Sequence, residues 1–379
     1  MADKKMIMIV AAIVVVIAVI AAAVMIASPS NDDPSEKIKI IDGAGKEIIL
    51  DKPLDKVVIG NTNVPKMCVI LGAEEYVTGL SFYATGSDKS NWDKYSPLFP
   101  NATHMSIEPN MTAEEVSKVA KAVIVPVSSM TISYAQELSY NQMGITVIRL
   151  NCNGETAQED MEKLTILFGK TDKIMANYND YWGYYNKIVD DVKEKAKEAG
   201  VGSERFLFYY SGLTAFYNQT SSMSAMTESV AGKNSLREIV NLDLSGVSNR
   251  ADQLGIREAI TELDHDKPID VLFMRGSSSM NSESLAEKMF KDSEIFKSYM
   301  NLSAIENNEI YAFMSEPMSG CLSYVGYVLI AEAIGVDTGY NPTDLVDAYN
   351  KKYGFSESTT GLSFHITVDG SEVTATQLF

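Results

Sequence analysis

Arg275 is the residue of this chain that is best placed to bind an anion. The chain has six arginines, and this one directly follows residues 270–274, whose last four side chains are apolar and indicate a buried strand. Ligands of parallel sheets bind beyond the carboxyl ends of the strands, so the guanidinium should emerge beside a ligand. A guanidinium pairs well with carboxylate and phosphate groups. The sequence therefore predicts that Arg275 holds an anionic group, with a surface or structural arginine as the alternative.

The other candidate ligand-binding residues follow the expected strands. Tyrosine, tryptophan and methionine there would make broad, polarisable walls suited to a macrocycle or an aromatic chelator. Each side chain has a role in packing or at the surface as its alternative. Trp92, expected in a polar loop, is interpreted as a lid of the cleft or as an interface anchor. With Arg275, the predicted ligand-binding residues are Asn61, Asn63, Tyr83, Trp92, Ser128, Tyr210, Tyr217 and Met314.

The sequence lacks the motifs of common enzymes. It has no Gly-x-Ser-x-Gly elbow and no His-Glu-x-x-His, and residues 43–46 lack the spacing of a phosphate-binding loop. Its three histidines disfavour a site for a bare transition metal, whereas a chelated metal brings its own ligands. The net charge of -18 argues against nucleic acid or anionic lipid as the main partner. We predict a binding protein, not an enzyme, with no cofactor and no metal site of its own.

Short apolar runs alternate with amphipathic stretches from residue 56 onward, which is the pattern of a βαβ lobe with a parallel sheet. Runs rich in valine and isoleucine predict buried strands, and the stretches between them predict helices. Thr112 and Glu115 resemble a capping box. The predicted strands are residues 56–59, 76–80, 122–126 and 146–150, and the predicted helices are residues 65–71, 114–120 and 134–143.

The longest predicted helix, residues 172–199, has apolar and aromatic side chains at spacings of three and four. At about 1.5 Å per residue it would reach roughly 42 Å, which suits a strut between two lobes. A second alternating series follows, and Asp369-Gly370 then indicates a β-hairpin. In this second part, strands are predicted at residues 205–210, 270–274, 309–313, 364–368 and 372–376, and helices at residues 235–240, 282–288, 322–334 and 343–353.

The first residues predict a transmembrane helix. Residues 6–27 form an unbroken apolar run behind Lys4 and Lys5. At about 1.5 Å per residue the run spans roughly 33 Å, enough to cross a bilayer, and the lysines favour a cytoplasmic N-terminus. A cleavable signal peptide is the alternative, because small residues lie at 23–28. The predicted division is an anchor or signal segment (1–27), a linker (28–37), an N-terminal α/β lobe (38–168), a lobe-spanning helix (169–202), a C-terminal α/β lobe (203–353) and a tail with a β-hairpin (354–379).

Several short motifs, in their order along the chain, carry a family resemblance. They are residues 41–50 (IDGAGKEIIL), Pro53, 56–59 (KVVI), 71–72, 77–79, 109–110 before Glu114, 144–147, 232–234 and 304–311. Over about residues 38–353 the chain resembles the extracellular solute-binding proteins of ABC importers for ferric siderophores, haem and cobalamin, the periplasmic binding proteins of class III. The resemblance implies two Rossmann-like α/β lobes with parallel sheets, joined by one long rigid helix, with the ligand in the cleft between them.

The resemblance also implies a function and partners. The apolar run at residues 6–27 predicts a single pass through the cell membrane with the soluble domain extracellular, and the resemblance implies that this domain captures a metal chelate for an ABC permease and ATPase. Relatives carry a docking glutamate on the first helix, where this chain has Lys66, and Glu228 keeps an acid at the matching place in the second lobe. Glu228 is therefore the predicted permease-docking residue. The alternative function is a surface sensory or adhesive protein without transport, for which Lys66 and the tail hairpin are the hints.

Overall fold

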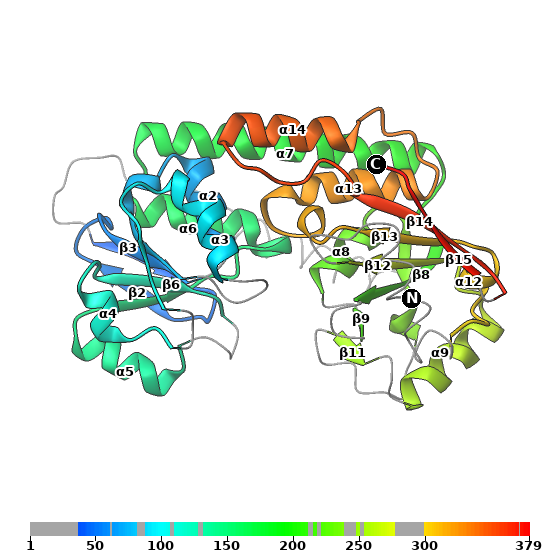
Figure 1. Ribbon diagram of the computed structural model, residues 1–379, viewed down its shortest axis with the longest axis horizontal. Coiled ribbons are helices and arrows are strands. Elements are labelled where there is room, and N and C mark those ends of the chain that lie inside the picture. The colour runs from blue at the N-terminus through cyan, green and yellow to red at the C-terminus, as the bar shows by residue number, and fades with distance from the viewer. Residues whose placement is uncertain are drawn as a thin grey trace, which may run out of the picture.

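The computed structural model describes residues 37–60, 63–81, 88–106, 110–127, 132–210, 215–217, 221–238, 248–250, 254–276, 299–370 and 372–379. They form two α/β lobes that lie side by side beneath one long helix, α7 (Figure 1). The predicted α/β class, with parallel sheets and a long helix, is confirmed.

The first lobe is built on a parallel sheet with the strand order β5-β4-β3-β6-β7. Its central strands β3 and β6 are fully buried, which explains why valine and isoleucine fill them. The four predicted strands are confirmed to within one residue at each end. The elements are β1 (Ile38–Ile41), β2 (Glu47–Leu50), β3 (Val57–Ile59), α2 (Val64–Leu71), η1 (Glu74–Tyr76), β4 (Val77–Leu80), α3 (Asp88–Tyr95), η2 (Ser96–Leu98), β5 (Thr103–His104), α4 (Ala113–Ser117), β6 (Ala122–Val125), α5 (Tyr134–Gln142), β7 (Thr146–Arg149), η3 (Gly154–Thr156) and α6 (Ala157–Leu167).

The caps of α4 and α5 correct one prediction. The Thr112 side chain accepts a hydrogen bond from the Glu115 backbone N–H, but the Glu115 carboxylate accepts from the Ser106 N–H. The predicted capping box is therefore only half formed, and α4 ends three residues earlier than predicted. A complete capping box starts α5 instead, where Ser133 and Gln136 bond reciprocally.

Helix α7 (Asp172–Glu198) confirms the predicted strut. The Thr171 hydroxyl caps its first turn by accepting from the Ile174 N–H. Its buried stripe packs on α2 and α6 of the first lobe and on α13 of the second lobe. The largest apolar cluster continues from the first lobe through α7 into the second lobe, so the two lobes share one core.

The second lobe has a mixed sheet with the strand order β11-β9-β8-β12-β13-β14-β15, and β10 also pairs with β8. Strands β8, β12 and β13 are parallel, whereas β14 pairs antiparallel with β13 and continues through the predicted hairpin into β15. The elements are β8 (Glu204–Tyr210), β9 (Ala215–Tyr217), α8 (Ser222–Glu228), β10 (Gly232–Asn234), η4 (Ser235–Glu238), β11 (Ser248–Arg250), α9 (Leu254–Asp266), β12 (Val271–Arg275), α12 (Ser303–Glu306), β13 (Ile310–Phe313), η6 (Glu316–Met318), η7 (Gly320–Leu322), α13 (Ser323–Ala333), α14 (Pro342–Tyr353), β14 (Ser363–Asp369) and β15 (Glu372–Gln377).

Some predicted elements differ from the structure or lie outside it. Residues 235–238 form a 3-10 turn rather than the start of an α-helix. The helix predicted at residues 282–288 falls outside the described residues. Within the described part of the chain, no helix is both long and apolar enough to cross a membrane. The transmembrane helix at residues 6–27 precedes the first described residue and stays a prediction.

Candidate functional site

Arg275 ends β12, at the carboxyl end of a central parallel strand, as the sequence predicts. Its guanidinium is half-buried, and Nη1 donates to the Tyr217 hydroxyl oxygen at 2.9 Å. Tyr217 is buried on β9, with its ring edge-on to Phe208 at 5.6 Å between centroids. Two of the predicted site residues therefore meet, and Tyr217 fixes the position of the guanidinium.

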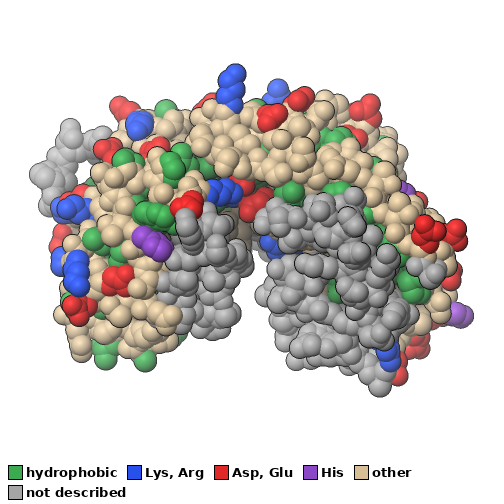
Figure 2. All heavy atoms as spheres, in the orientation of Figure 1, with side chains coloured by type: hydrophobic (Ala, Val, Ile, Leu, Met, Phe, Trp, Pro, Cys, Tyr) green, Lys and Arg blue, Asp and Glu red, His purple; other side chains and the backbone are tan. Residues whose placement is uncertain are grey.

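Beside this pair, four charged side chains join the two lobes, and we call them the interlobe network: Lys66, Lys94, Glu316 and Glu357. Lys66 Nζ lies 2.7 Å from Glu316 Oε2 and 3.0 Å from Glu357 Oε1. Lys94 Nζ lies 2.7 Å from the other oxygen of Glu357. The lysines belong to α2 and α3 of the first lobe, and the acids belong to η6 and the segment after α14. Figure 2 shows basic and acidic side chains side by side where the lobes meet, above a hollow between them.

Burial makes this network unlike an ordinary surface ion pair. The Lys66 side chain is 7% exposed and that of Glu357 is 2% exposed. Lys66, which stands where relatives carry a docking glutamate, is too buried to contact a permease. Its ammonium is held inside because two carboxylates compensate for the lost hydration.

The pKa values follow from these contacts. Burial opposes the charge on Lys66, but the nearby Tyr95, Glu316 and Glu357 raise the pKa of Lys66 well above its ordinary value. The Lys66 ammonium holds the pKa of Glu316 below its ordinary value, against the opposing effect of burial. Arg275 acts on Glu316 in the same direction, which brings it within electrostatic reach of the interlobe network. Three basic and two acidic side chains of the described part of the chain thus meet at the lobe junction.

The remaining predicted ligand-binding residues take different positions. Asn63 lies at the lobe junction, because a Cβ added to Gly320 would come within 3.0 Å of its Oδ1. Trp92 lies on α3 rather than in a loop, partly buried, with its ring centroid 4.9 Å from that of His104. Met314 is 4% exposed and packs in the largest apolar cluster. Asn61, Tyr83 and Ser128 lie outside the described residues, and for Tyr210 only the backbone is described.

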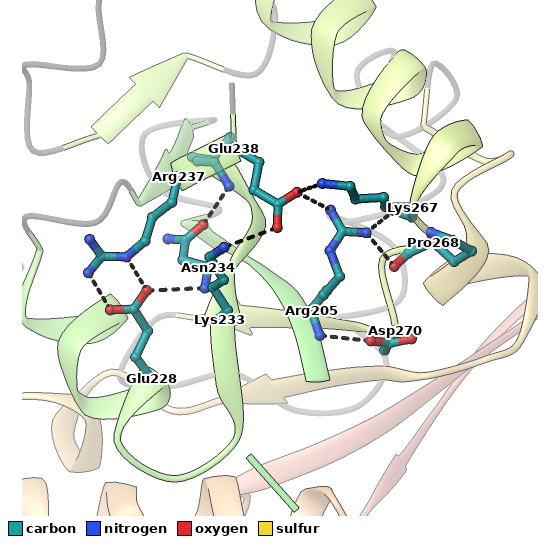
Figure 3. Close-up of polar contacts among 10 residues, drawn as sticks. Arg205, Glu228, Lys233, Asn234, Arg237, Glu238, Lys267, Pro268 and Asp270 are labelled. Carbon is teal, nitrogen blue, oxygen red and sulfur yellow. Dashed lines mark hydrogen bonds and ion pairs between the residues drawn. The ribbon is translucent and has the colours of Figure 1, made fainter. Parts of the chain in front are cut away.

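Glu228, the predicted docking residue, is already engaged within its own lobe. Its carboxylate accepts from Nε and Nη2 of Arg237 and, at 3.2 Å, from the Asn234 backbone N–H (Figure 3). The Glu228 side chain is 18% exposed. An arginine of a permease would therefore have to displace Arg237 before it could bind this carboxylate.

A second group of ion pairs lies at the amino ends of the strands of the second lobe. We call it the second-lobe network: Arg205, Lys233, Glu238 and Lys267 (Figure 3). The Glu238 carboxylate receives Lys267 at 2.8 Å, Lys233 at 3.3 Å and Arg205 at 3.5 Å. Arg205 Nη1 also donates to the carbonyl oxygens of Lys267 and Pro268. These contacts tie β8, η4 and the turn before β12 together, so they serve the fold of this lobe.

Cysteine and histidine chemistry is sparse in the described residues. Cys68, Cys152 and Cys321 are all buried and free, and burial raises the pKa of the Cys321 thiol to about 12. Within the described ranges, no group of three or more histidine, cysteine, aspartate or glutamate side chains could hold a metal ion.

Sequence reasoning missed the interlobe network. One signal for Lys66 was present, because it is the only charged residue in the apolar run of α2, VPKMCVIL, and a buried charge needs a partner. No local signal pointed to that partner, since Lys66 and Glu316 are 250 residues apart and Lys94 and Glu357 are 263 residues apart.

Comparison with known proteins identifies the fold. No protein-family model and no curated protein sequence matches the chain. A TroA-like periplasmic binding protein, FepB from Veillonella parvula, aligns over 85% of this chain and 97% of its own, with a TM-score of 0.60 and 15% identity. CeuE from Helicobacter pylori with Ni(II) bound aligns over 85% of this chain and 98% of its own, with a TM-score of 0.58 and 14% identity.

A third solved structure is described as an ABC-type Fe3+-hydroxamate transport system from Saccharomonospora viridis. It aligns over 78% of this chain and 98% of its own, with a TM-score of 0.54 and 15% identity. At such identities the likeness shows the fold alone. The chain therefore has the bilobal fold of TroA-like periplasmic binding proteins, as the sequence resemblance implied.

Proposed function

We propose that this protein is a membrane-tethered extracellular solute-binding protein that captures an anionic metal chelate between its lobes and delivers it to an ABC importer. The observation that carries the proposal is Arg275, held by Tyr217 at the carboxyl end of β12 and beside the interlobe network. Among the described residues of this junction three basic side chains meet two acidic ones, in a chain whose net charge is -18. Such a local surplus of positive charge attracts an anion that the protein as a whole would repel.

The fold supports a chelate as the ligand. Open α/β sheets bind ligands beyond the carboxyl ends of their strands, where Arg275 lies. The solved proteins of this fold include one described as part of an Fe3+-hydroxamate transport system. A ferric siderophore with carboxylate or other anionic groups is the preferred class, ahead of haem and a corrinoid.

A binding experiment tests this site. Native mass spectrometry should find a chelate that co-purifies with the protein, and calorimetry should measure binding of ferric siderophores, haem and cobalamin. Arg275→Ala should lower the affinity for the bound chelate about ten- to a hundredfold, because a charge-assisted hydrogen bond is lost in a partly dry site. Arg275→Lys should restore only part of the affinity, since lysine lacks the planar fork.

Arg257→Ala is the matched control, because Arg257 lies on α9 rather than on the strand that ends at Arg275. This variant should bind like the wild type. A folded Arg275→Ala protein with wild-type affinity would show that Arg275 is not a ligand residue. If no ferric siderophore, haem or cobalamin binds, the proposal that the ligand is a metal chelate is wrong.

The tether and the docking step need separate tests. N-terminal sequencing of the native protein should find residues 6–27 retained, and a start near Ser28 or Ser30 would show cleavage. For docking, Glu228→Gln should weaken binding to the permease complex, provided that Arg237 can be displaced. Unchanged docking would mean that other acidic residues form the interface with the permease.

The alternative of a sensory or adhesive protein rested on Lys66 and the tail hairpin. Lys66 is buried in an ion pair with Glu316, and β14 of the hairpin extends the sheet of the second lobe, so both features have a role in the fold.

A further inference from the structure

A pocket of about 330 Å³ lies along α7, on the side that faces α8. Its lining comes from both lobes, with Gly154 and Gln158 from the first lobe and α8 and Tyr327 from the second lobe. Ligand pockets usually measure roughly 300 to 1,000 Å³. This pocket is at the small end of that range, so it suits a molecule much smaller than a siderophore, haem or corrinoid.

Part of the pocket lining is apolar. The Trp182 indole lines it at 6% exposure and is fixed by a hydrogen bond from Nε1 to the sulfur of Met161 at 3.1 Å. Met223, Met226 and Met318 complete this wall. Aromatic and thioether groups together form a polarisable surface that packs well against a flat hydrocarbon or an aromatic ring.

The lining also contains a basic side chain, Lys193. Lys193 lies on the same face of α7 as Trp182, eleven residues further along. At the helical rise this separates the Cα atoms of the two residues by roughly 16 Å along the helix axis. Its ammonium is half-buried and lies over the Tyr327 ring, 5.2 Å from the centroid. Asp190 also lines the pocket, and its carboxylate disfavours a ligand with a second negative charge.

We propose that this pocket is a second ligand site, which binds a small monocarboxylate with an aromatic or apolar body. The body packs against Trp182 and the methionines, and the carboxylate accepts a hydrogen bond from Lys193. The chemistry of the lining selects this class, since the apolar side chains disfavour a fully polar solute and Asp190 disfavours a dianion. The site is separate from the proposed chelate site, whose key residue Arg275 is not among the pocket residues.

The position of the pocket gives the bound molecule a structural role. Gly154 of the first lobe approaches Ser222 of the second lobe so closely that an added Cβ would lie 2.2 Å from the Ser222 Cβ. A ligand beside this contact touches both lobes at once. It therefore stabilises their present arrangement by binding to the folded, assembled form.

Tryptophan fluorescence offers a direct test, because the chain has two tryptophans. In a Trp92→Phe background, Trp182 is the sole reporter and lies in the pocket wall. We expect 3-phenylpropionate to change its emission saturably, and neutral 3-phenylpropanamide to bind about tenfold more weakly, since it lacks the charge-assisted bond to Lys193. Equal affinity for the acid and the amide, or no saturable change at millimolar concentrations, would overturn the proposal.

Substitutions then locate the site. Lys193→Met should weaken 3-phenylpropionate binding about tenfold and leave the amide unaffected, whereas Lys187→Met, on the exposed side of the same helix, should change neither. Ala225→Leu, which fills the pocket from α8, should abolish binding of both. Binding that survives Ala225→Leu in a folded protein would place the probe elsewhere and reject the site. No chelate is used, so the outcome is independent of the proposed function.

Discussion

The interlobe network and the second-lobe network use the same kinds of side chain but differ in burial and in how far apart their partners lie along the chain. In the interlobe network Lys66 and Glu357 are 7% and 2% exposed, and Lys66 of the first lobe pairs with Glu316 of the second lobe. In the second-lobe network Lys233 and Lys267 are more than half exposed, and all members lie within 63 residues of one another. The first network therefore fixes the arrangement of the lobes, whereas the second fixes segments within one lobe.

This difference has a physical consequence for function. A buried ion pair is costly to break because the remaining charge stays in a dry site, whereas an exposed charge is taken up by water. With α7 and the shared apolar core, the interlobe network resists rotation of the lobes. We therefore expect ligand binding to cause little closure.

The largest expected effect follows from removing Lys66. Lys66→Met keeps the length of the side chain but leaves Glu357 buried with one partner fewer, so we expect a loss of about 3 to 5 kcal/mol in the free energy of unfolding. Urea denaturation measures it. Lys118→Met is the control, because Lys118 forms an exposed pair with Glu114 that should contribute only about 0.3 to 0.5 kcal/mol. A cost below about 1 kcal/mol for Lys66→Met would contradict the role assigned to burial.

A second change should recover part of that loss. In Lys66→Met/Glu357→Leu both buried charges are absent, and an apolar pair replaces them. We expect the loss in free energy of unfolding of the double variant to be about 2 kcal/mol smaller than the sum of the losses of the two single variants. The reason is that most of each loss arises from leaving a buried charge unpaired. Strict additivity in the double-mutant cycle would mean that the two side chains do not interact.

Scattering tests the consequence of this rigidity. The radius of gyration of the wild type should change little when the chelate binds. Lys66→Met should widen the range of lobe arrangements and make the ligand-dependent change larger. Small-angle X-ray scattering with and without ligand measures both. A large decrease in the wild type would mean that the lobes close by a hinge that the network does not restrain.

The same contrast explains what the sequence could reveal. The strands of the first lobe and α7 were predictable because runs of valine and isoleucine and a helical stripe are local patterns. The place of Arg275 at the end of a strand was predictable because it directly follows an apolar run. The interlobe network was not, since its partners come together only through the fold. Trp92 was misplaced because a polar run with one tryptophan resembles a loop, yet residues 88–95 form α3.

A smaller effect is expected in the second-lobe network. Glu238→Gln removes the acid that three basic side chains share, and the exposure of Lys233 and Lys267 allows water and ions to compensate for two of the three lost contacts. We expect a loss of about 1 kcal/mol at low salt. Urea denaturation in 1 M sodium chloride should nearly abolish this loss, because the Debye length falls to about 3 Å, while the loss in Lys66→Met should persist. Equal salt sensitivity of the two variants would remove the distinction between the networks.

The smallest expected effect is a pH dependence of the loss in free energy of unfolding that Glu238→Gln causes. Lys267 and the other basic partners lower the pKa of Glu238 from 4.5 to about 2. The unfolded chain then binds this proton more readily than the folded chain, so the stabilisation is complete above about pH 4.5 and is lost as the pH falls towards 2. The difference in unfolding free energy between wild type and Glu238→Gln should therefore shrink between pH 5.5 and about pH 3. Urea titrations at each pH measure it, and a difference that stays constant would show that the ion pairs, as drawn in Figure 3, do not stabilise the fold.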